Sequence, residues 1–226
     1  MIKLTKYFNG LLYLVNPSLC QLCKKPILKE EDILCCECFF RLPKTTINES
    51  NIKLLFYDIK PLRRILCLYK YEKNNSIQKL IHNLKYKNKK NVGIFFGKEI
   101  SKMLRNKNLA NDFDFIVPLP IHKKKEKERG YNQSFTIAKE IGNQLNIPVK
   151  NFILKKTVTE SQTRKRYYAR WENQENKFTL TKKKYLNGKR IIIIDDVITS
   201  GSTMYNCISL FKNLEVNITV LFVANA

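Results

Sequence analysis

Two adjacent carboxylates and a run of hydroxyl side chains follow a strongly apolar segment near the end of the chain. Asp195 and Asp196 come directly after four consecutive isoleucines, Ile191–Ile194, and the hydroxyl-rich run Thr199–Thr203 begins shortly after them. Neighbouring carboxylates bind hydroxyl groups and divalent cations, whereas hydroxyls and backbone N–H groups at the start of a helix bind phosphate. The segment therefore has the chemistry to hold a phosphorylated ligand together with a divalent cation.

The same pattern predicts the elements that would position these groups. The β-branched run predicts a central parallel strand that is buried on both faces. Gly201 permits a sharp turn, and apolar spacing from about Thr203 to Leu214 predicts a helix. Backbone N–H groups of the loop and the positive end of the helix dipole would then face one point. The alternative is a buried strand that ends in a solvated acidic turn.

The segment from Ile191 to Thr203 resembles the phosphoribosyl pyrophosphate (PRPP) signature of type I phosphoribosyltransferases. That signature has a hydrophobic strand, an acidic pair, a small hydrophobic residue and a Thr-Thr-Gly-x-Thr loop. Here Ser200 replaces a common threonine and keeps the hydroxyl. The resemblance implies that Asp195 and Asp196 bind the ribose hydroxyls, with Mg²⁺ on the pyrophosphate. It also implies a 5′-phosphate loop made of Thr199, Ser200, Gly201, Ser202 and Thr203.

A second strand, loop and helix unit precedes this one. Phe115–Leu119 is a short apolar run stopped by Pro120, and Lys123–Arg129 carries five lysine and arginine residues. We interpret this basic run as a loop before a helix over about 132–145, with a solvated hairpin or surface helix start as the alternative. In the phosphoribosyltransferase fold this position contacts pyrophosphate, and a mobile loop closes over the reacting centre. The implied pyrophosphate contacts are Leu119, Pro120, His122 and Arg129, with Lys85 as a further candidate or else a surface lysine.

Four of the seven cysteines are spaced as metal ligands. Cys20 and Cys23 form one Cys-x-x-Cys pair, Cys35 and Cys38 form another, and eleven residues separate the pairs. Four thiolates at this spacing predict a closed tetrahedral site for structural Zn²⁺, which a module too small for its own core needs. Cys36 is extra, and we expect it to point away. The alternative is a set of free or redox-active thiols.

The order of these motifs resembles the ComF family of competence-associated proteins. A four-cysteine module comes first, then PLPIHKKKEKERGYNQS, then the PRPP signature. The run Arg129–Gln133 is what separates this family from nucleotide-salvage relatives, and Gln162, Arg170, Asn173 and Phe178 fit the family as well. The resemblance implies a PRPP-binding protein that acts in DNA uptake during natural transformation, with single-stranded DNA and other uptake or recombination proteins as partners.

Basic and aromatic residues alternate between Thr157 and Trp171. Cations can bind phosphates while rings stack on bases, the combination used to bind single-stranded nucleic acid. The candidate residues are Arg164, Arg166, Tyr167, Arg170 and Trp171. The alternative is a flap that covers the sheet, with its rings packed down and its charges in solvent.

Further segments have weaker patterns. Residues 4–15 predict a short helix with an apolar face, Leu54–Tyr57 and Arg64–Tyr71 predict strands, and Ile218–Val223 predicts a final strand. Helices are predicted after a cap at Asn75 or Ser76 and over Val92–Leu104.

Length and composition frame the whole chain. With 226 residues and 44% hydrophobic side chains, there is room for one α/β domain and a small module. We expect residues 1–45 to form an N-terminal helix and zinc module, and 46–226 a type I phosphoribosyltransferase-like domain with a central parallel sheet. No apolar run reaches the roughly 20 residues that span a bilayer, and no signal-peptide pattern is present, so a cytoplasmic location is expected.

The formal charge of +23 indicates attraction to polyanions, or else lysines accumulated on solvated faces in an AT-rich genome. Three functions are compatible with these patterns. The first is PRPP binding in the service of DNA uptake. The second is nucleic-acid binding by a zinc-stapled protein without transferase chemistry. The third is a metabolic phosphoribosyltransferase that acts on a nucleobase or amine.

Overall fold

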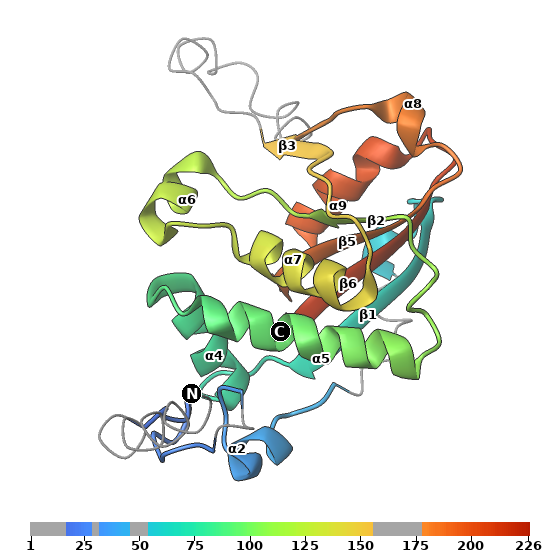
Figure 1. Cartoon of the computed structure of the whole chain (residues 1–226). Helices are drawn as coiled ribbons and strands as arrows, with labels where there is room; N and C mark the ends of the chain where they lie inside the picture. The colour runs from blue at the N-terminus through green and yellow to red at the C-terminus, as the bar shows by residue number, and fades with distance from the viewer. Residues whose placement is uncertain (1–16, 29–31, 46–53, 156–177) are drawn as a thin grey trace, which may run out of the picture.

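The computed structural model describes residues 17–28, 32–45, 54–155 and 178–226 (Figure 1). Within them, no helix is both long enough and apolar enough to cross a membrane. The helices, 3-10 helices (η) and strands are α2 (Cys36–Phe40), η1 (Leu54–Phe56), β1 (Leu62–Lys70), α4 (Ser76–Tyr86), α5 (Lys90–Asn106), β2 (Phe115–Pro118), α6 (Lys123–Arg129), α7 (Gln133–Leu145), β3 (Ile153–Lys155), β4 (Phe178–Leu180), α8 (Lys183–Leu186), β5 (Arg190–Ile198), α9 (Ser202–Ile208), η3 (Ser209–Phe211) and β6 (Asn217–Asn225).

A parallel sheet forms the centre of the molecule. Its strand order is β1-β6-β5-β2, and each neighbouring pair is parallel. Beyond β2, a parallel bridge joins Ile116 to Val149. Because all four strands run in one direction, their carboxyl ends meet at one edge, where open α/β sheets bind ligands. A separate antiparallel pair is formed by β3 and β4.

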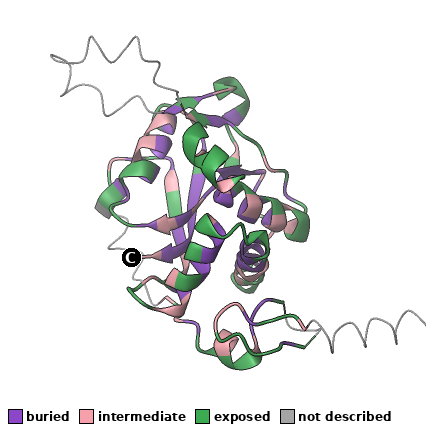
Figure 2. Cartoon of the chain, turned by 90° about the vertical axis from the view of Figure 1, so that its left-hand side faces the viewer, coloured by how far each residue is buried: buried purple, intermediate pink, exposed green. Residues whose placement is uncertain are grey.

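Both faces of the sheet are covered, as Figure 2 shows by the burial of its strands. Alternate isoleucines of β5 belong to different cores: Ile192 and Ile194 pack with α4, α5 and α7, whereas Ile191 and Ile193 pack with η1, α9 and η3. All four are fully buried. The period-2 alternation of a strand thus explains why four consecutive isoleucines are needed, and confirms the prediction of a central parallel strand.

The N-terminal cysteine-containing segment packs on the same core as α4 and α5. Its buried residues Ile27, Leu34 and Leu42 belong to that cluster. The Phe39 ring contacts the Phe95 ring of α5 edge-on, with 6.2 Å between centroids, and Lys98 of α5 forms an ion pair with Asp32. The segment therefore shares an apolar core with the α/β domain.

The basic run after β2 is a helix, which corrects the prediction of a loop. Lys123–Arg129 forms α6, in which the Lys124 N–H donates to His122 Nδ1 (3.2 Å) and Gly130 ends the helix at φ +75°. Lysine, glutamate and arginine are good helix formers, and a capping residue before them with glycine after them completes the helix. The prediction of a loop followed the charges of this run, whereas its helix propensity favours the alternative, the start of a surface helix.

Two further predictions are corrected. Leu54–Phe56 forms η1 and not a strand: Phe56 and Ile59 are buried in the core beneath α9, so this turn packs on a helix and adds no strand to the sheet. The helix predicted to reach Leu214 ends at Ile208 and tightens into η3. The Ser209 hydroxyl donates to the Asn206 carbonyl (3.1 Å) there, an interaction that competes with the α-helical ladder.

The remaining element predictions within the described residues are confirmed, with small shifts at the ends. Asn75 caps α4, its side chain accepting the Gln78 N–H at 2.9 Å. β1, α5, α7 and β6 lie where the patterns placed them. The predicted helix over residues 4–15 and the basic and aromatic segment from Thr157 to Trp171 lie outside the described residues.

Candidate functional site

A cavity of about 420 Å³ lies at the carboxyl ends of β2 and β5. Most of the phosphate and ribose residues predicted from the sequence line it together: Lys85, Leu119, Pro120, His122, Arg129, Asp195, Asp196, Thr199 and Thr203. Ser200, Gly201 and Ser202 belong to the same loop but do not line the cavity. The other lining residues were not named individually as contacts: Ile121, Lys125, Gln133, Ser134 and Val197 lie within motifs that the sequence singled out, whereas Tyr71 and Lys155 lie outside them.

Asp196 forms an ion pair with a lysine of helix α4. The Lys85 ammonium, in the last turn of α4, lies 2.9 Å from Asp196 Oδ1, and the two side chains are 22% and 10% exposed. The Val197 N–H donates to the same carboxylate oxygen at 2.7 Å. Lys85 is thus a partly buried member of the cavity wall.

Asp195 is held by a serine of α7. The Ser134 hydroxyl donates to Asp195 Oδ1 at 2.9 Å, and the Asp196 N–H donates to the same oxygen at 2.9 Å. Burial, together with the negative charge of Asp196, raises the pKa of Asp195 to about 7, although the Ser134 hydrogen bond and the Lys85 charge act in the opposite direction. Asp195 therefore has to lose its proton, near neutral pH, before its carboxylate can face a cation.

The loop between β5 and α9 depends on a glycine. Gly201 has φ +72°, and a Cβ atom there would lie 3.2 Å from Leu55 Cδ1 and 3.3 Å from Phe56 Cζ. The segment around η1 thus packs directly beneath the loop. It is fixed to α9 by Asp58, whose Oδ2 accepts the Tyr205 hydroxyl and the Lys212 ammonium, each at 2.7 Å.

Gly201→Ala is expected to lower the free energy of unfolding by about 1–3 kcal/mol, because alanine is strained at this φ and its methyl group crowds η1. Urea denaturation measures the change. Gly188→Ala is the matched control, since Gly188 has φ +74° but open space around its Cβ position. The control isolates the backbone strain, so equal losses in the two variants would contradict packing of the loop against η1.

The run Arg129–Ser134 connects three elements around the cavity. Asn132 caps α7 by accepting the Ser134 N–H (3.0 Å), and its side-chain amide donates to the Leu119 carbonyl (3.0 Å). The Tyr131 hydroxyl donates to the Leu84 carbonyl of α4, and Arg129 donates to Gln133 Oε1 (2.9 Å). The sequence singled out Arg129–Gln133 as a family pattern, and these contacts place the next residue, Ser134, against Asp195.

The four predicted metal ligands converge. The Sγ atoms of Cys20, Cys23, Cys35 and Cys38 lie within 4.8 Å of one another, and Cys36 is exposed and outside this group, as expected. Burial raises the pKa of Cys20, but backbone N–H groups outweigh burial and lower the pKa to about 6. Burial and the neighbouring thiols raise the pKa of Cys38. Four thiolates this close repel one another unless a cation joins them, so the donor set fits a tetrahedral divalent ion.

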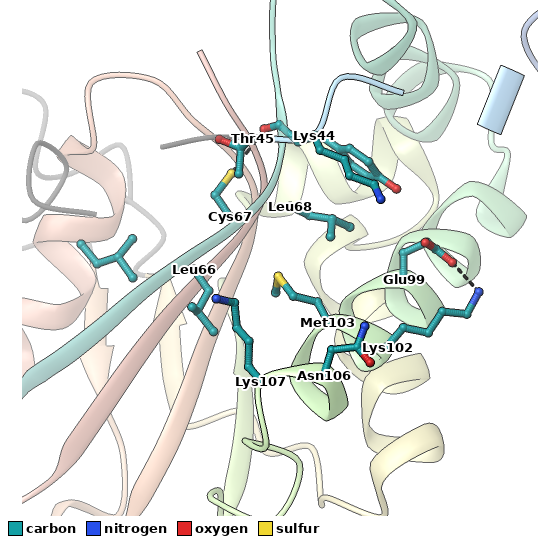
Figure 3. A pocket seen from close by; sticks show the side chains of 12 residues that line it. Lys44, Thr45, Leu66, Cys67, Leu68, Glu99, Lys102, Met103, Asn106 and Lys107 are labelled. Atoms are coloured by element: carbon teal, nitrogen blue, oxygen red, sulfur yellow. Dashed lines mark hydrogen bonds and ion pairs between the residues drawn. The ribbon is translucent and has the colours of Figure 1, made fainter. Parts of the chain in front are cut away.

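A different hollow, of about 430 Å³, lies between β1 and α5 (Figure 3). Lysines dominate its polar lining, and Glu99 is the only carboxylate that the described residues contribute. That carboxylate is 2.7 Å from the Lys102 ammonium. The hollow has neither an acidic pair nor a loop at a helix start, so it does not compete with the cavity at β5. The predicted nucleic-acid residues between Thr157 and Trp171 lie outside the described residues.

Comparison with known proteins gives one family and several relatives. Residues 131–226 match the family described as phosphoribosyl transferase domain. Competence protein F of Haemophilus influenzae is 34% identical over 104 residues, which cover 45% of each chain. Competence protein ComFC of Bacillus subtilis is 26% identical over 191 residues, or 84% of this chain and 70% of that one. DNA utilization protein YhgH of Escherichia coli O157:H7 is 24% identical over 207 residues, or 84% and 89%.

The matched region contains β5, the loop after it and α9, and the parallel sheet is that of the type I phosphoribosyltransferase fold. The match with Competence protein F spans less than half the length of that relative, whereas ComFC and YhgH are matched over most of theirs. The N-terminal four-cysteine cluster precedes this domain, in the order expected from the sequence. These findings support the resemblance of this chain to the ComF family of competence-associated, phosphoribosyltransferase-like proteins.

Proposed function

We propose that this chain binds PRPP with Mg²⁺ in the cavity at the carboxyl ends of β2 and β5, and that it serves DNA uptake during natural transformation in the cytoplasm. One observation carries the first half. In a single cavity, the carboxylates of Asp195 and Asp196 meet the loop that begins at Thr199 and a wall of cationic side chains. A ligand with vicinal hydroxyls, a phosphate and a pyrophosphate matches each of these three chemistries.

Each group has a distinct part in this proposal. Asp195 and Asp196 bind the ribose hydroxyls and orient the hydrated Mg²⁺ that accompanies the pyrophosphate. The loop Thr199–Thr203 binds the 5′-phosphate through backbone N–H groups and hydroxyls. His122 and Arg129, on the wall that follows β2, face the pyrophosphate. Bound Mg²⁺ would neutralise charge on the pyrophosphate, and the side chains would orient the ribose for loss of that group.

The DNA-related half is supported by the names of the relatives, two competence proteins and a DNA utilization protein. The charge of +23 favours a polyanionic partner. We propose single-stranded DNA as that partner, with the basic and aromatic segment around Arg164 and Trp171 contributing, and other uptake or recombination proteins as further partners. Zn²⁺ is the ion we propose for the four cysteines, in a structural role.

Calorimetric titration of the zinc-loaded protein with PRPP tests the first half, in the presence and absence of Mg²⁺. Saturable binding that strengthens with Mg²⁺ is expected. An absence of binding heat in a folded, zinc-loaded protein would overturn the proposal. Pyrophosphate release in the presence of a panel of nucleobases and amines separates binding from transfer: release with one acceptor would favour the metabolic transferase instead.

Ser134→Ala is expected to shift the pH dependence of PRPP binding upward. Burial and Asp196 raise the pKa of Asp195 from 3.8 to about 7, and the Ser134 hydroxyl opposes that shift by stabilising the carboxylate. If Mg²⁺·PRPP needs the ionised pair, affinity falls by up to about tenfold per pH unit below the pKa. Removing the Ser134 hydroxyl should raise the pH midpoint of PRPP binding further, so that the affinity falls more at pH 6.5 than at pH 8.5.

Ser101→Ala is the matched control, because Ser101 is also buried and donates to a backbone carbonyl (Gly97, 2.8 Å) away from the cavity. Its pH midpoint should equal that of the wild type. A midpoint that stays in place or moves downward in Ser134→Ala would contradict the role given to this serine.

The raised pKa of Asp195 also means that the folded state binds this proton more tightly than the unfolded state. The contribution of Asp195 to the free energy of unfolding therefore falls as pH rises from about 4 to about 7.

A further inference from the structure

A groove of about 540 Å³ runs between the Cys20–Cys23 turn and helix α4. Two of its lining residues, Tyr71 and Lys85, also line the cavity proposed for PRPP, so the two spaces adjoin. Its full lining is Gln21, Leu22, Lys24, Tyr71, Gln78, Lys79, Ile81, His82, Asn83, Lys85, Tyr86 and Lys87.

The α4 wall of the groove presents exposed rings. The centroids of His82 and Tyr86 are 4.9 Å apart, and Tyr86 is 66% exposed. The Arg129 guanidinium, which lines the PRPP cavity, lies 5.4 Å from the Tyr86 ring centroid. An exposed aromatic ring on the surface of a groove offers a face for stacking a planar ligand, and the arginine increases the electrostatic attraction there for an anionic one.

The remaining lining is cationic and amidic. Lys24, Lys79 and Lys87 are exposed, and the described residues bring no aspartate or glutamate to the groove. Lys24 has φ +67° and follows Cys23, and its N–H donates to the Cys20 carbonyl (3.1 Å). The turn that contains Cys20 and Cys23 therefore forms one wall of the groove. Gln21 and Asn83 add amide donors and acceptors of the type that read the edge of a base.

We propose that this groove binds a phosphorylated nucleotide, with its base on the ring of Tyr86 and its phosphate on Lys79 and Lys87. The position beside Lys85 and Tyr71 sets that nucleotide next to the ligand of the neighbouring cavity. The inference rests on the proposed function only for the identity of that neighbouring ligand. The same chemistry is supplied by a free nucleotide or by one unit of a single strand, and the experiment distinguishes them.

Fluorescence anisotropy of a labelled single-stranded oligoadenylate tests the groove, with the zinc-loaded full chain. Tyr86→Ala is expected to weaken binding about tenfold, the usual order for one lost base–ring stack. Lys79→Glu/Lys87→Glu is expected to weaken it at least as much. The matched control is Lys183→Glu/Lys184→Glu, which makes the same charge change on α8, away from the groove.

Competition identifies the source of the nucleotide. Displacement by adenosine 5′-monophosphate at concentrations where inorganic phosphate has no effect supports a free-nucleotide site. Displacement only by unlabelled oligonucleotide supports a strand site. Equal losses in the α8 control and the groove variant, an unchanged affinity in Tyr86→Ala, or equally effective competition by inorganic phosphate would each overturn the proposal, because each means attraction to charge without recognition of a base.

Calorimetry with PRPP and Mg²⁺ on the same variants separates this inference from the proposed function. Lys79 and Lys87 do not line the PRPP cavity, so the Lys79→Glu/Lys87→Glu variant should keep the PRPP affinity of the wild type, whereas Tyr86→Ala also removes the ring that Arg129 contacts. Oligonucleotide binding that depends on Tyr86, in a protein that binds no PRPP, would refute the proposed function and support the nucleotide site in the groove.

Discussion

Replacing Asp195 and Asp196 together with asparagine is expected to abolish Mg²⁺-dependent PRPP binding. Asparagine keeps the size of the side chain and one oxygen acceptor but removes the charge of Asp196, which is buried beside Lys85, and the charge of ionised Asp195, which is partly buried. Hydrogen bonds to charged groups contribute about 1.5–3 kcal/mol each, so two of them correspond to at least about a hundredfold in affinity. Calorimetric titration with PRPP in excess Mg²⁺ measures the loss directly.

The matched control is Asp112→Asn/Asp114→Asn, which makes the same change in net charge elsewhere on the molecule. Asp112 and Asp114 form ion pairs with Arg190, at the amino end of β5, and do not line the cavity. This control should retain PRPP binding. Tight binding by the Asp195/Asp196 variant would refute the site, and loss of binding in both variants would mean that overall charge, and not the acidic pair, governs the affinity.

The strand β5 and the loop after it could be predicted from sequence because their determinants are local. Four consecutive β-branched residues are typical of a strand that is buried on both faces of a sheet. Gly201, the only glycine of that segment, indicates where the chain turns. The cysteine cluster was predictable for the same reason, since ligand spacing within each Cys-x-x-Cys pair is set by a few bonds.

The partners of the acidic pair depend on tertiary structure and were not predictable to the same degree. Lys85 has the ordinary appearance of a lysine in a basic run, and only the packing of α4 beside the end of β5 brings its ammonium to Asp196. Ser134 is one hydroxyl residue among several, and its hydrogen bond to Asp195 forms at the start of α7, where Asn132 caps the helix. No periodicity in the sequence encodes either contact.

The prediction for α6 failed for a different reason, because a local signal for a helix was present in the sequence. His122, a run of good helix formers and Gly130 are the start, body and end of a helix. Five positive charges suggested a loop that contacts pyrophosphate, although charge alone does not oppose helix formation when every side chain can point to solvent. The strands β3 and β4 were missed because three-residue strands carry too little pattern for any period to be detected.

Cys20→Ser is expected to remove the bound zinc and to cause the second large loss, this time of stability. Cys20 is fully buried and is one of the four clustered thiols, so a serine there removes a thiolate and leaves a hydroxyl without the charge that the ion needs. Structural Zn²⁺ contributes about 10–16 kcal/mol to the folding of small modules. Because Ile27, Leu34 and Leu42 pack with α4 and α5, loss of the module should also lower the stability of the α/β domain.

Cys36→Ser is the matched control, since Cys36 is adjacent to a ligand in sequence but exposed and outside the cluster. Elemental analysis should give one zinc per chain in the wild type and the control and far less in Cys20→Ser, and thermal melting should follow the same order. Cys23 and Cys35, whose Sγ atoms are 3.6 Å apart, test the redox alternative. If those thiols oxidise readily in the purified protein and no zinc is bound, the cluster is a redox site, and the module owes its fold to its contacts with α4 and α5 alone.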